Sequence, residues 1–267
     1  MDFKGWVMKY LNDVNYKDCV GKVFKSNLSG DFKIVKYNDT TNVEIEFLKT
    51  GYETAVRLGD IKNGKVKDPY SSSVYGVGIL GTKYPSRECD RNTKEYTLWR
   101  NMLRRCYSDD FKKKNPTYID CEVSNKFKNY EYFYEWCHKQ IGFGNEGDEN
   151  PFHLDKDLLI KGNKVYSEDT CVFIPREINQ LLTKSTASRG ENLIGVTLEK
   201  SSGKFISQIS INSRNVKIGR FKTEIEAFNA YKVAKENVLR GLAEKWESQI
   251  DPRAYNALMN YEVNIND

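Results

Sequence analysis

The sequence predicts an α+β protein built from several small domains, and three observations support that prediction. Apolar and polar residues alternate between residues 21 and 68, which is typical of half-buried strands. Apolar residues then recur at helical spacing between residues 92 and 141. Alternating strands return after residue 195 and are followed by a helix with a capping signal. A chain of 267 residues is long enough for two or three such domains.

The domain boundaries follow from these changes of pattern. Residues 1–18 are expected to form an amphipathic helix, which either packs on the next domain or binds a partner. Residues 19–70 are expected to form a small antiparallel β-barrel or curled sheet, and residues 71–91, rich in Ser and Gly, a linker. Residues 92–186 predict a helical part followed by a ββα unit. Residues 190–267 predict a three-stranded sheet plus a helix and a C-terminal tail.

Composition places the chain among intracellular proteins. No run approaches the ~20 apolar residues that a bilayer span requires, and the first residues lack the apolar region of a secretion signal. The six cysteines show no CxxC spacing, so we expect reduced thiols in the cytoplasm and no membrane partner. The net charge of +5 is too small by itself to indicate a nucleic-acid partner.

A basic flank accompanies the first helix of the central part. Trp99, Met102, Leu103 and Cys106 form its apolar stripe. The flank consists of Arg100, Arg104 and Arg105, and three lysines, residues 112–114, are expected in the loop that follows. Such a run of charge is either a solvated face or a contact to the backbone of DNA. A second helix, residues 130–141, should turn Phe133, Trp136 and Cys137 inward.

The densest group of polar residues lies between residues 153 and 182. Residues 153–158 predict a strand with Asp155 and Lys156 at its centre, and residues 170–174 predict a second strand. Pro175 suits the first position of the helix that follows and contains Asn179.

This ββα unit has side chains suited to phosphodiester hydrolysis. Asp155 and Asn179 could supply two oxygen ligands to Mg²⁺ or another divalent metal. A histidine is the usual general base, and His153 would share a strand face with Asp155. Lys156 could act as the base only if burial lowered its pKa by several units.

The last part of the chain concentrates positive charge on a predicted sheet. Residues 195–222 hold six basic residues and a single acid, Glu199. A strand over residues 205–211 and another over residues 216–221 precede a capping box formed by Thr223 and Glu226. With the helix on one face, the other face is expected to carry Gln208, Ser210, Arg214, Lys217 and Arg220, which could enter the major groove of DNA.

Two known families share these patterns. The C-terminal part resembles the APETALA2-type DNA-binding domain at residues 195–196, 204–205, 218–221, 223–227 and 230–231, with Phe205 in place of the expected tryptophan. The ββα unit resembles the HNH nucleases. Asp155 matches their acid and Asn179 their last ligand, but Lys156 replaces the catalytic histidine and Thr170 the middle asparagine.

Nearly the whole chain is similar to bacteriophage proteins of homing-endonuclease type that join an HNH unit to an APETALA2-type domain. The matching segments are residues 96–107, 115–121, 154–179 and 255–267. The resemblance implies binding to double-stranded DNA in the cytoplasm of an infected bacterial cell, and metal-dependent cleavage if the site is active. The alternative is a nuclease-dead scaffold, which acts either as a protein-binding inhibitor of a host defence system or as a DNA-binding regulator. The sequence leaves the oligomeric state open, a homo-oligomer included.

Overall fold

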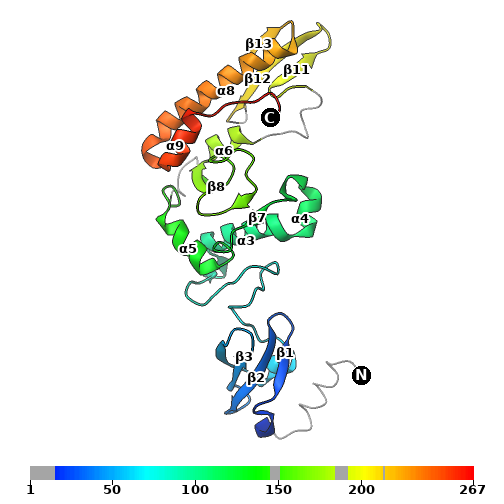
Figure 1. Ribbon diagram of the computed structural model, residues 1–267, viewed down its shortest axis with the longest axis vertical. Coiled ribbons are helices and arrows are strands. Elements are labelled where there is room, and N and C mark those ends of the chain that lie inside the picture. The colour runs from blue at the N-terminus through cyan, green and yellow to red at the C-terminus, as the bar shows by residue number, and fades with distance from the viewer. Residues whose placement is uncertain (1–15, 145–150, 184–191, 213) are drawn as a thin grey trace. The chain divides into compact units, whose positions relative to one another are not determined.

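The computed structural model describes residues 16–144, 151–183, 192–212 and 214–267 (Figure 1). It has the predicted α+β composition. The chain divides into two compact units, residues 1–134 and 135–267, and the division falls inside helix α5 (Tyr130–Lys139). The sequence instead groups residues 92–186 together. Of the expected N-terminal helix, residues 1–15 lie outside the described residues, and Tyr16–Cys19 form a short 3-10 helix, η1.

The first unit begins with a four-stranded antiparallel sheet in the order β1-β2-β3-β4. Its strands are Val23–Ser26, Gly30–Tyr37, Val43–Phe47 and Glu53–Val56, and helix α2 (Leu58–Lys62) follows. Along β3 every second side chain is buried, as the period of two predicts. Alternate residues of β2 and β3 therefore form the core of this domain, namely Phe32, Ile34, Val43, Ile45 and Phe47.

The segment expected as a linker, residues 71–91, is bonded to the start of α5. The backbone N–H of Ile79 donates to the carbonyl of Lys128, and the carbonyl of Ile79 accepts from Tyr130, both at 2.9 Å. The carboxylate of Glu131 accepts hydrogen bonds from the backbone of Thr82 and Lys83 at 2.8 and 2.7 Å. The segment ends in strand β5 (Arg87–Glu88), which pairs with β6 (Arg91–Asn92).

Helix α3 (Lys94–Tyr107) has the predicted amphipathic pattern. Thr93 caps it, because the threonine hydroxyl accepts from the backbone N–H of Tyr96 at 3.3 Å. The predicted stripe of Trp99, Met102, Leu103 and Cys106 is fully buried. The lysines at residues 112–114, expected in a loop, instead end a second helix, α4 (Asp109–Lys114), and a 3-10 turn, η2 (Pro116–Tyr118), and strand β7 (Glu122–Val123) follow.

The ββα unit comprises strands β8 (Phe152–Asp155) and β10 (Val172–Pro175), which pair antiparallel, the short strand β9 (Val165–Tyr166), and helix α6 (Arg176–Leu182). Two sequence expectations are wrong in detail. The first strand ends at Asp155, so Lys156 lies in the loop beyond it. Pro175 is the N-cap of α6 and not its first helical residue.

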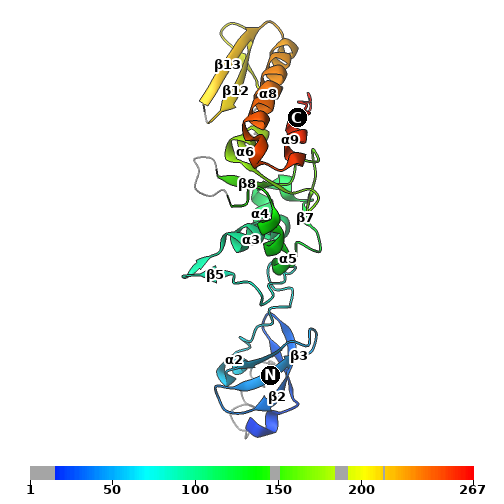
Figure 2. The ribbon, with the colours of Figure 1, turned by 90° about the vertical axis from the view of Figure 1, so that its left-hand side faces the viewer.

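The last part is the predicted sheet-plus-helix module, in which strands β11 (Val196–Glu199), β12 (Lys204–Ile211) and β13 (Arg214–Phe221) form an antiparallel sheet. Helix α8 (Glu224–Trp246) begins at the predicted capping box of Thr223 and Glu226. It runs along one face of the sheet (Figures 1 and 2). The 3-10 turn η3 (Glu247–Gln249) and helix α9 (Pro252–Met259) follow.

Helical spacing after Thr223 predicts that Ala227, Ala230, Tyr231, Ala234 and Val238 are buried against the sheet. The packing of α8 differs in part from this prediction. Ala227 and Tyr231 are buried as predicted, but Phe228 and Leu239 join them, whereas Ala230, Ala234 and Val238 are only half-buried. Within the described residues no helix is long and apolar enough to cross a membrane. The six cysteines are free thiols, and all except Cys89 are buried.

Candidate nucleic-acid interface and ββα site

The face of the sheet that α8 leaves uncovered carries basic and amide side chains in direct cross-strand pairs. Antiparallel partners share a face, so the register of β12 and β13 identifies its members. Gln208 lies opposite Lys217, Ile206 opposite Arg220, and Ser210 opposite Asn215. We call this surface, with Thr197 and Glu199 of β11, the outer face. Ser207 and Ile209, which alternate with these residues on β12, are buried.

A β-bulge brings the two basic residues of β13 onto the same face. Lys217 and Arg220 are three residues apart, and strict alternation would place them on opposite faces. The register shifts between Ser207 and Gln208, so that Ile218 is the extra residue of β13 without a direct partner. The extra residue shifts the alternation by one position, so Lys217 before it and Arg220 after it lie on the same face. Both side chains are exposed.

Arg214 does not belong to the outer face, although the sequence grouped it there. It lies opposite Ile211, in the row that alternates with Gln208 and Ser210. Its side chain is exposed at the beginning of β13. The register therefore separates Arg214 from Lys217 and Arg220.

The acidic residue of the outer face is engaged by one of the basic ones. Arg220 Nη2 donates to Glu199 Oε1 at 2.6 Å. The hydroxyl of Ser202, which also donates to this carboxylate, together with Arg220, holds the pKa of Glu199 below its ordinary value. Arg220 is exposed and Glu199 is partly exposed, so this surface pair contributes little to stability, but it neutralises part of the positive charge on this face.

In the ββα unit the structure brings His153 and Asn179 together. His153 lies on β8 opposite Ile174, and Asn179 projects from α6 towards it. The Nδ2 atom of Asn179 is 3.4 Å from Nδ1 of His153, at the outer limit of hydrogen bonding. The sequence paired Asn179 with Asp155 as metal ligands, and the contact that the structure shows for Asn179 is with His153.

Asp155 has a structural use in the turn that follows β8. Its Oδ1 atom accepts from the backbone N–H groups of Asp157 and Leu158, at 2.9 and 2.7 Å. Burial of the carboxyl raises the pKa of Asp155, against the effect of these two hydrogen bonds. The side chain therefore fixes the local backbone, and its charged form is disfavoured by the surroundings.

Lys156, which stands where the HNH pattern has its histidine, is bound inside the same loop. The residue is buried, with 7% of its surface exposed. Its Nζ atom donates to Asp157 Oδ1 at 2.6 Å and to the carbonyl of Asn163 at 2.8 Å, and lies 5.7 Å from the ring centroid of Tyr166. An amine that is used as a donor to fixed groups is poorly placed to accept a proton from water.

Asn163 and Thr170 organise this loop: the sequence predicts a turn at Gly162-Asn163, and Thr170 stands where the HNH pattern has its middle asparagine. The amide of Asn163 donates to the carbonyls of Lys156 and Val165, at 2.8 and 2.7 Å, and accepts from Val165 at 3.1 Å. The hydroxyl of Thr170 donates to Val165 as well, at 2.7 Å. The Gly162-Asn163 turn was the available signal, because Asn often bonds to backbone two residues away.

Two observations bear on whether the ββα unit could hold the divalent metal that the resemblance implies. One oxygen of Asp155 is committed to two backbone groups, and Asn179 meets His153 through its amide nitrogen. Across the described parts of the chain, no three or more His, Cys, Asp and Glu side chains gather in a way that could hold an ion. We therefore derive no catalytic step through a metal.

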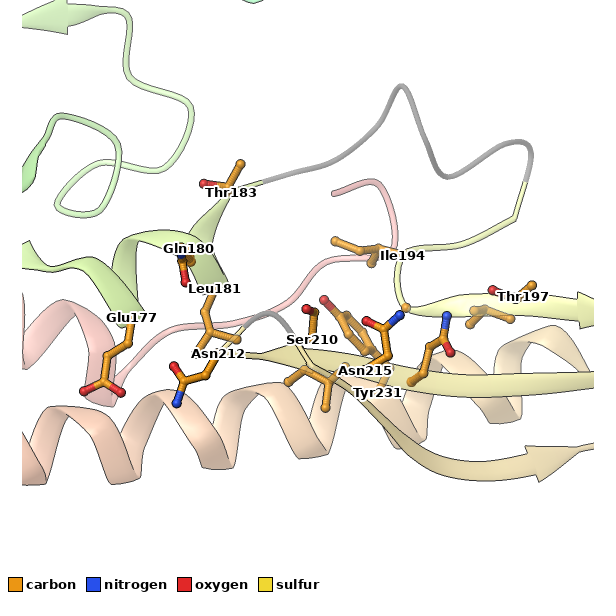
Figure 3. A pocket seen from close by; sticks show the side chains of 14 residues that line it. Glu177, Gln180, Leu181, Thr183, Ile194, Thr197, Ser210, Asn212, Asn215 and Tyr231 are labelled. Carbon is orange, nitrogen blue, oxygen red and sulfur yellow. The ribbon is translucent and has the colours of Figure 1, made fainter. Parts of the chain in front are cut away.

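A pocket of about 600 Å³ lies between α6 and the end of the sheet (Figure 3). Its wall on α6 includes Gln180 and Thr183, and its other side includes Gln208 and Asn215 of the outer face. Its lining combines amide, hydroxyl and apolar groups with the carboxylate of Glu177, and it contains no Lys, Arg or His. One end of the outer face is therefore bordered by polar groups and one acidic side chain.

The predicted basic flank of α3 lies in the first unit. Arg100 and Arg104 are exposed and Arg105 is half-buried. The guanidinium carbon of Arg100 lies 6.0 Å from the ring centroid of Tyr75. The flank and the sheet therefore belong to different units.

Comparisons with protein-family models, with curated proteins and with solved structures found no match.

Proposed function

We propose that this chain is a DNA-binding protein whose outer face of β11, β12 and β13 contacts duplex DNA. The observation that carries the proposal is the register around the bulge. It places Lys217 and Arg220 on one face with the amide of Gln208, opposite the face that α8 covers. A segment of residues 195–222 with six basic residues and one acid supplies the matching charge.

The chemistry of this face suits a nucleic acid. Lysine and arginine neutralise phosphates and release counterions, and arginine also pairs with guanine. An amide such as that of Gln208 or Asn215 can pair with the edge of adenine. A narrow antiparallel sheet is one of the elements that proteins place in a DNA groove. The outer face thus combines groups that hold the backbone with groups that can distinguish bases.

A pair of opposite substitutions tests the proposal. Lys217→Gln should weaken binding to a duplex and reduce the slope of log K against log salt by about one, because one phosphate contact is lost. Glu199→Gln should tighten binding, because it removes a negative charge and releases Arg220. Fluorescence anisotropy over a series of salt concentrations measures both. Lys139→Gln, at an exposed lysine on α5, serves as the control and should bind as the unmodified protein does.

The two results must have opposite signs for the proposal to stand. Equal affinities for all four proteins would remove the outer face from DNA binding. An affinity that depends neither on salt nor on Lys217 would favour the alternative in which the chain binds a host protein.

We further propose that the ββα unit serves as a scaffold and does not cut DNA. The structural bonds of Asp155 and Lys156 support this reading. With Mg²⁺ or Mn²⁺, the purified protein should leave a supercoiled plasmid as intact as an Asn179→Ala variant does. The proximity of His153 and Asn179 favours the opposite outcome. Nicking that disappears in both His153→Ala and Asn179→Ala would establish cleavage and overturn the scaffold proposal.

A further inference from the structure

Two arginines and two aromatic rings form a continuous row in the first unit. The guanidinium carbon of Arg104 lies 5.2 Å from the ring centroid of Phe111, and that of Arg105 lies 5.9 Å from the centroid of Tyr118. The two rings contact each other edge to face, with centroids 5.6 Å apart and an interplanar angle of 69°. We call these four residues the arginine–aromatic row.

Local structure explains why the four residues of the row, which span positions 104 to 118, lie on one surface. Both arginines lie in the last turn of α3, whose neighbouring Leu103 and Cys106 are fully buried and fix the rotation of the helix. Ser108 ends α3 and also caps α4, since its hydroxyl accepts from the backbone N–H of Phe111 at 3.4 Å. The turn η2 then returns the chain so that Tyr118 meets Phe111.

The charge around the row is positive. Residues 94–118 contain seven basic and three acidic residues. Two of the acids, Asp109 and Asp110, are in the first turn of α4, where the helix dipole stabilises them, and the lysines of residues 112–114 occupy its last turn. Consecutive residues of a helix point about 100° apart, so the three lysines add positive charge around α4 and do not all share one face.

We propose that the arginine–aromatic row forms a second DNA contact, which holds the phosphodiester backbone, and that the lysines of residues 112–114 contribute to the positive charge around it. A guanidinium is a planar fork that matches two phosphate oxygens, and a ring beneath it restricts its motion, so that less entropy is lost on binding. Two such forks on consecutive residues suit the repeated phosphates of a strand. The inference rests on the proposed function in that DNA is the ligand, but it involves none of the residues of the outer face.

Removal of the two charges tests the contact. The double variant Arg104→Gln, Arg105→Gln should bind a 40-base-pair duplex on the order of tenfold more weakly, and its salt slope should be smaller by about two, one for each phosphate contact. Arg57→Gln, at an exposed arginine in the small β domain, is the matched control and should leave both quantities unchanged.

Removal of the rings tests whether Phe111 and Tyr118 position the arginines. The variants Phe111→Leu and Tyr118→Leu keep every charge, so the salt slope should stay the same while affinity falls several-fold. The circular dichroism spectrum of each variant must match that of the unmodified protein. If a substitution unfolded α4, affinity would fall for a reason unrelated to the positioning of the arginines. Rings that can be removed without any effect on affinity would overturn the positioning role.

The same titrations separate failure of this inference from failure of the proposed function. If Lys217→Gln weakens binding and the double arginine variant does not, the second contact is wrong and the outer face stands. If only the arginine variant weakens binding, the outer face is wrong and the row is the DNA contact. Competition by polyglutamate that equals competition by DNA at the same charge concentration would overturn the assignment to a phosphodiester backbone.

Discussion

At the end of β8, Asp155 and Lys156 are held by the loop that follows them, and these bonds determine what either side chain can do. The Asp155 carboxylate accepts two backbone N–H groups, and Lys156 donates to a carboxylate and a carbonyl. In the HNH pattern the same two positions would carry the acid and the base. Here both side chains take part in hydrogen bonds within the loop, to which Asn163 also contributes.

The turn after β8 gives a prediction that separates the charge of Asp155 from its hydrogen bonds. Asp155→Asn keeps an acceptor oxygen for both N–H groups and removes a charge that burial disfavours. At pH 7 its free energy of unfolding should equal or exceed that of the unmodified protein. Asp155→Ala should lose about 1–3 kcal/mol, because the N–H of buried Leu158 would have no acceptor. Urea denaturation followed by circular dichroism measures both changes.

The pH dependence of this difference has a definite sign. The folded-state pKa of Asp155 is raised, so the unfolded chain ionises first as pH increases, and the carboxylate costs stability above that range. Any advantage of Asp155→Asn should therefore vanish below about pH 4, where the aspartate is protonated in both states. An asparagine variant as unstable as Asp155→Ala at pH 7 would show that the ionised carboxylate itself is needed.

At the scale of single elements, the sequence predicts helices with clear boundaries well. Thr93 precedes the apolar stripe of α3, and the pair Thr223 and Glu226 precedes α8; both caps are present in the structure. These signals are local, since a cap and the residue it bonds lie within three positions of each other. The strand alternation of residues 205–211 is equally local, and it correctly predicts that Ile209 is buried.

Features that depend on pairing between segments were not predictable in this way. The bulge at Ile218 is a property of two strands together, and without it no alternation places Lys217 and Arg220 on one face while moving Arg214 off it. Helix α4 was missed because three consecutive lysines have no helical period, although Ser108 and two acids at its start are helix signals.

Much the same holds for the candidate sites. The sequence paired Asn179 with Asp155 as metal ligands, whereas the contact that the structure shows for Asn179 is with His153. His153 lies on β8, which is separated from α6 by β9 and β10, so spacing along the chain could not predict this contact. Spacing also did not give Asp155 and Lys156 their loop bonds, which involve residues up to seven positions away. It also missed the aromatic partners of the α3 arginines, because Phe111 and Tyr118 reach them only through the path of α4 and η2.

At the scale of the second unit, Glu177 joins the ββα unit to the sheet-plus-helix module. The Oε1 atom of this buried residue on α6 accepts from the indole nitrogen of Trp246 at 2.6 Å and from Lys245 at 2.7 Å, both on α8. The ring of Phe152 on β8 meets Trp246 edge to face at 5.6 Å. Even without nuclease activity, the ββα unit would therefore be needed to hold α8 in place, and with α8 the outer face.

A further bond ties the loop of the ββα unit to the end of the chain. Lys161 donates to the carboxylate of Asp267 at 2.6 Å and to the carbonyl of Glu262 at 2.9 Å. In the same C-terminal segment, the carbonyl of Val263 accepts a hydrogen bond from Lys232 of α8 at 3.0 Å. The ββα unit is therefore connected to α8 directly through Glu177 on α6, and indirectly through its loop and the C-terminal segment.

These contacts predict that α6 and α8 open together. In native-state hydrogen exchange, the slowest amides of both helices should report the same free energy of opening. Glu177→Ala should lower stability by about 1–3 kcal/mol, chiefly through the unpaired indole N–H of Trp246, because the half-exposed Lys245 contributes little. In that variant α6 should exchange at a lower free energy than α8. Glu177→Gln keeps an acceptor for the indole N–H and should preserve joint opening of α6 and α8. If α6 opens at a lower free energy than α8 in the unmodified protein, the two modules are not coupled.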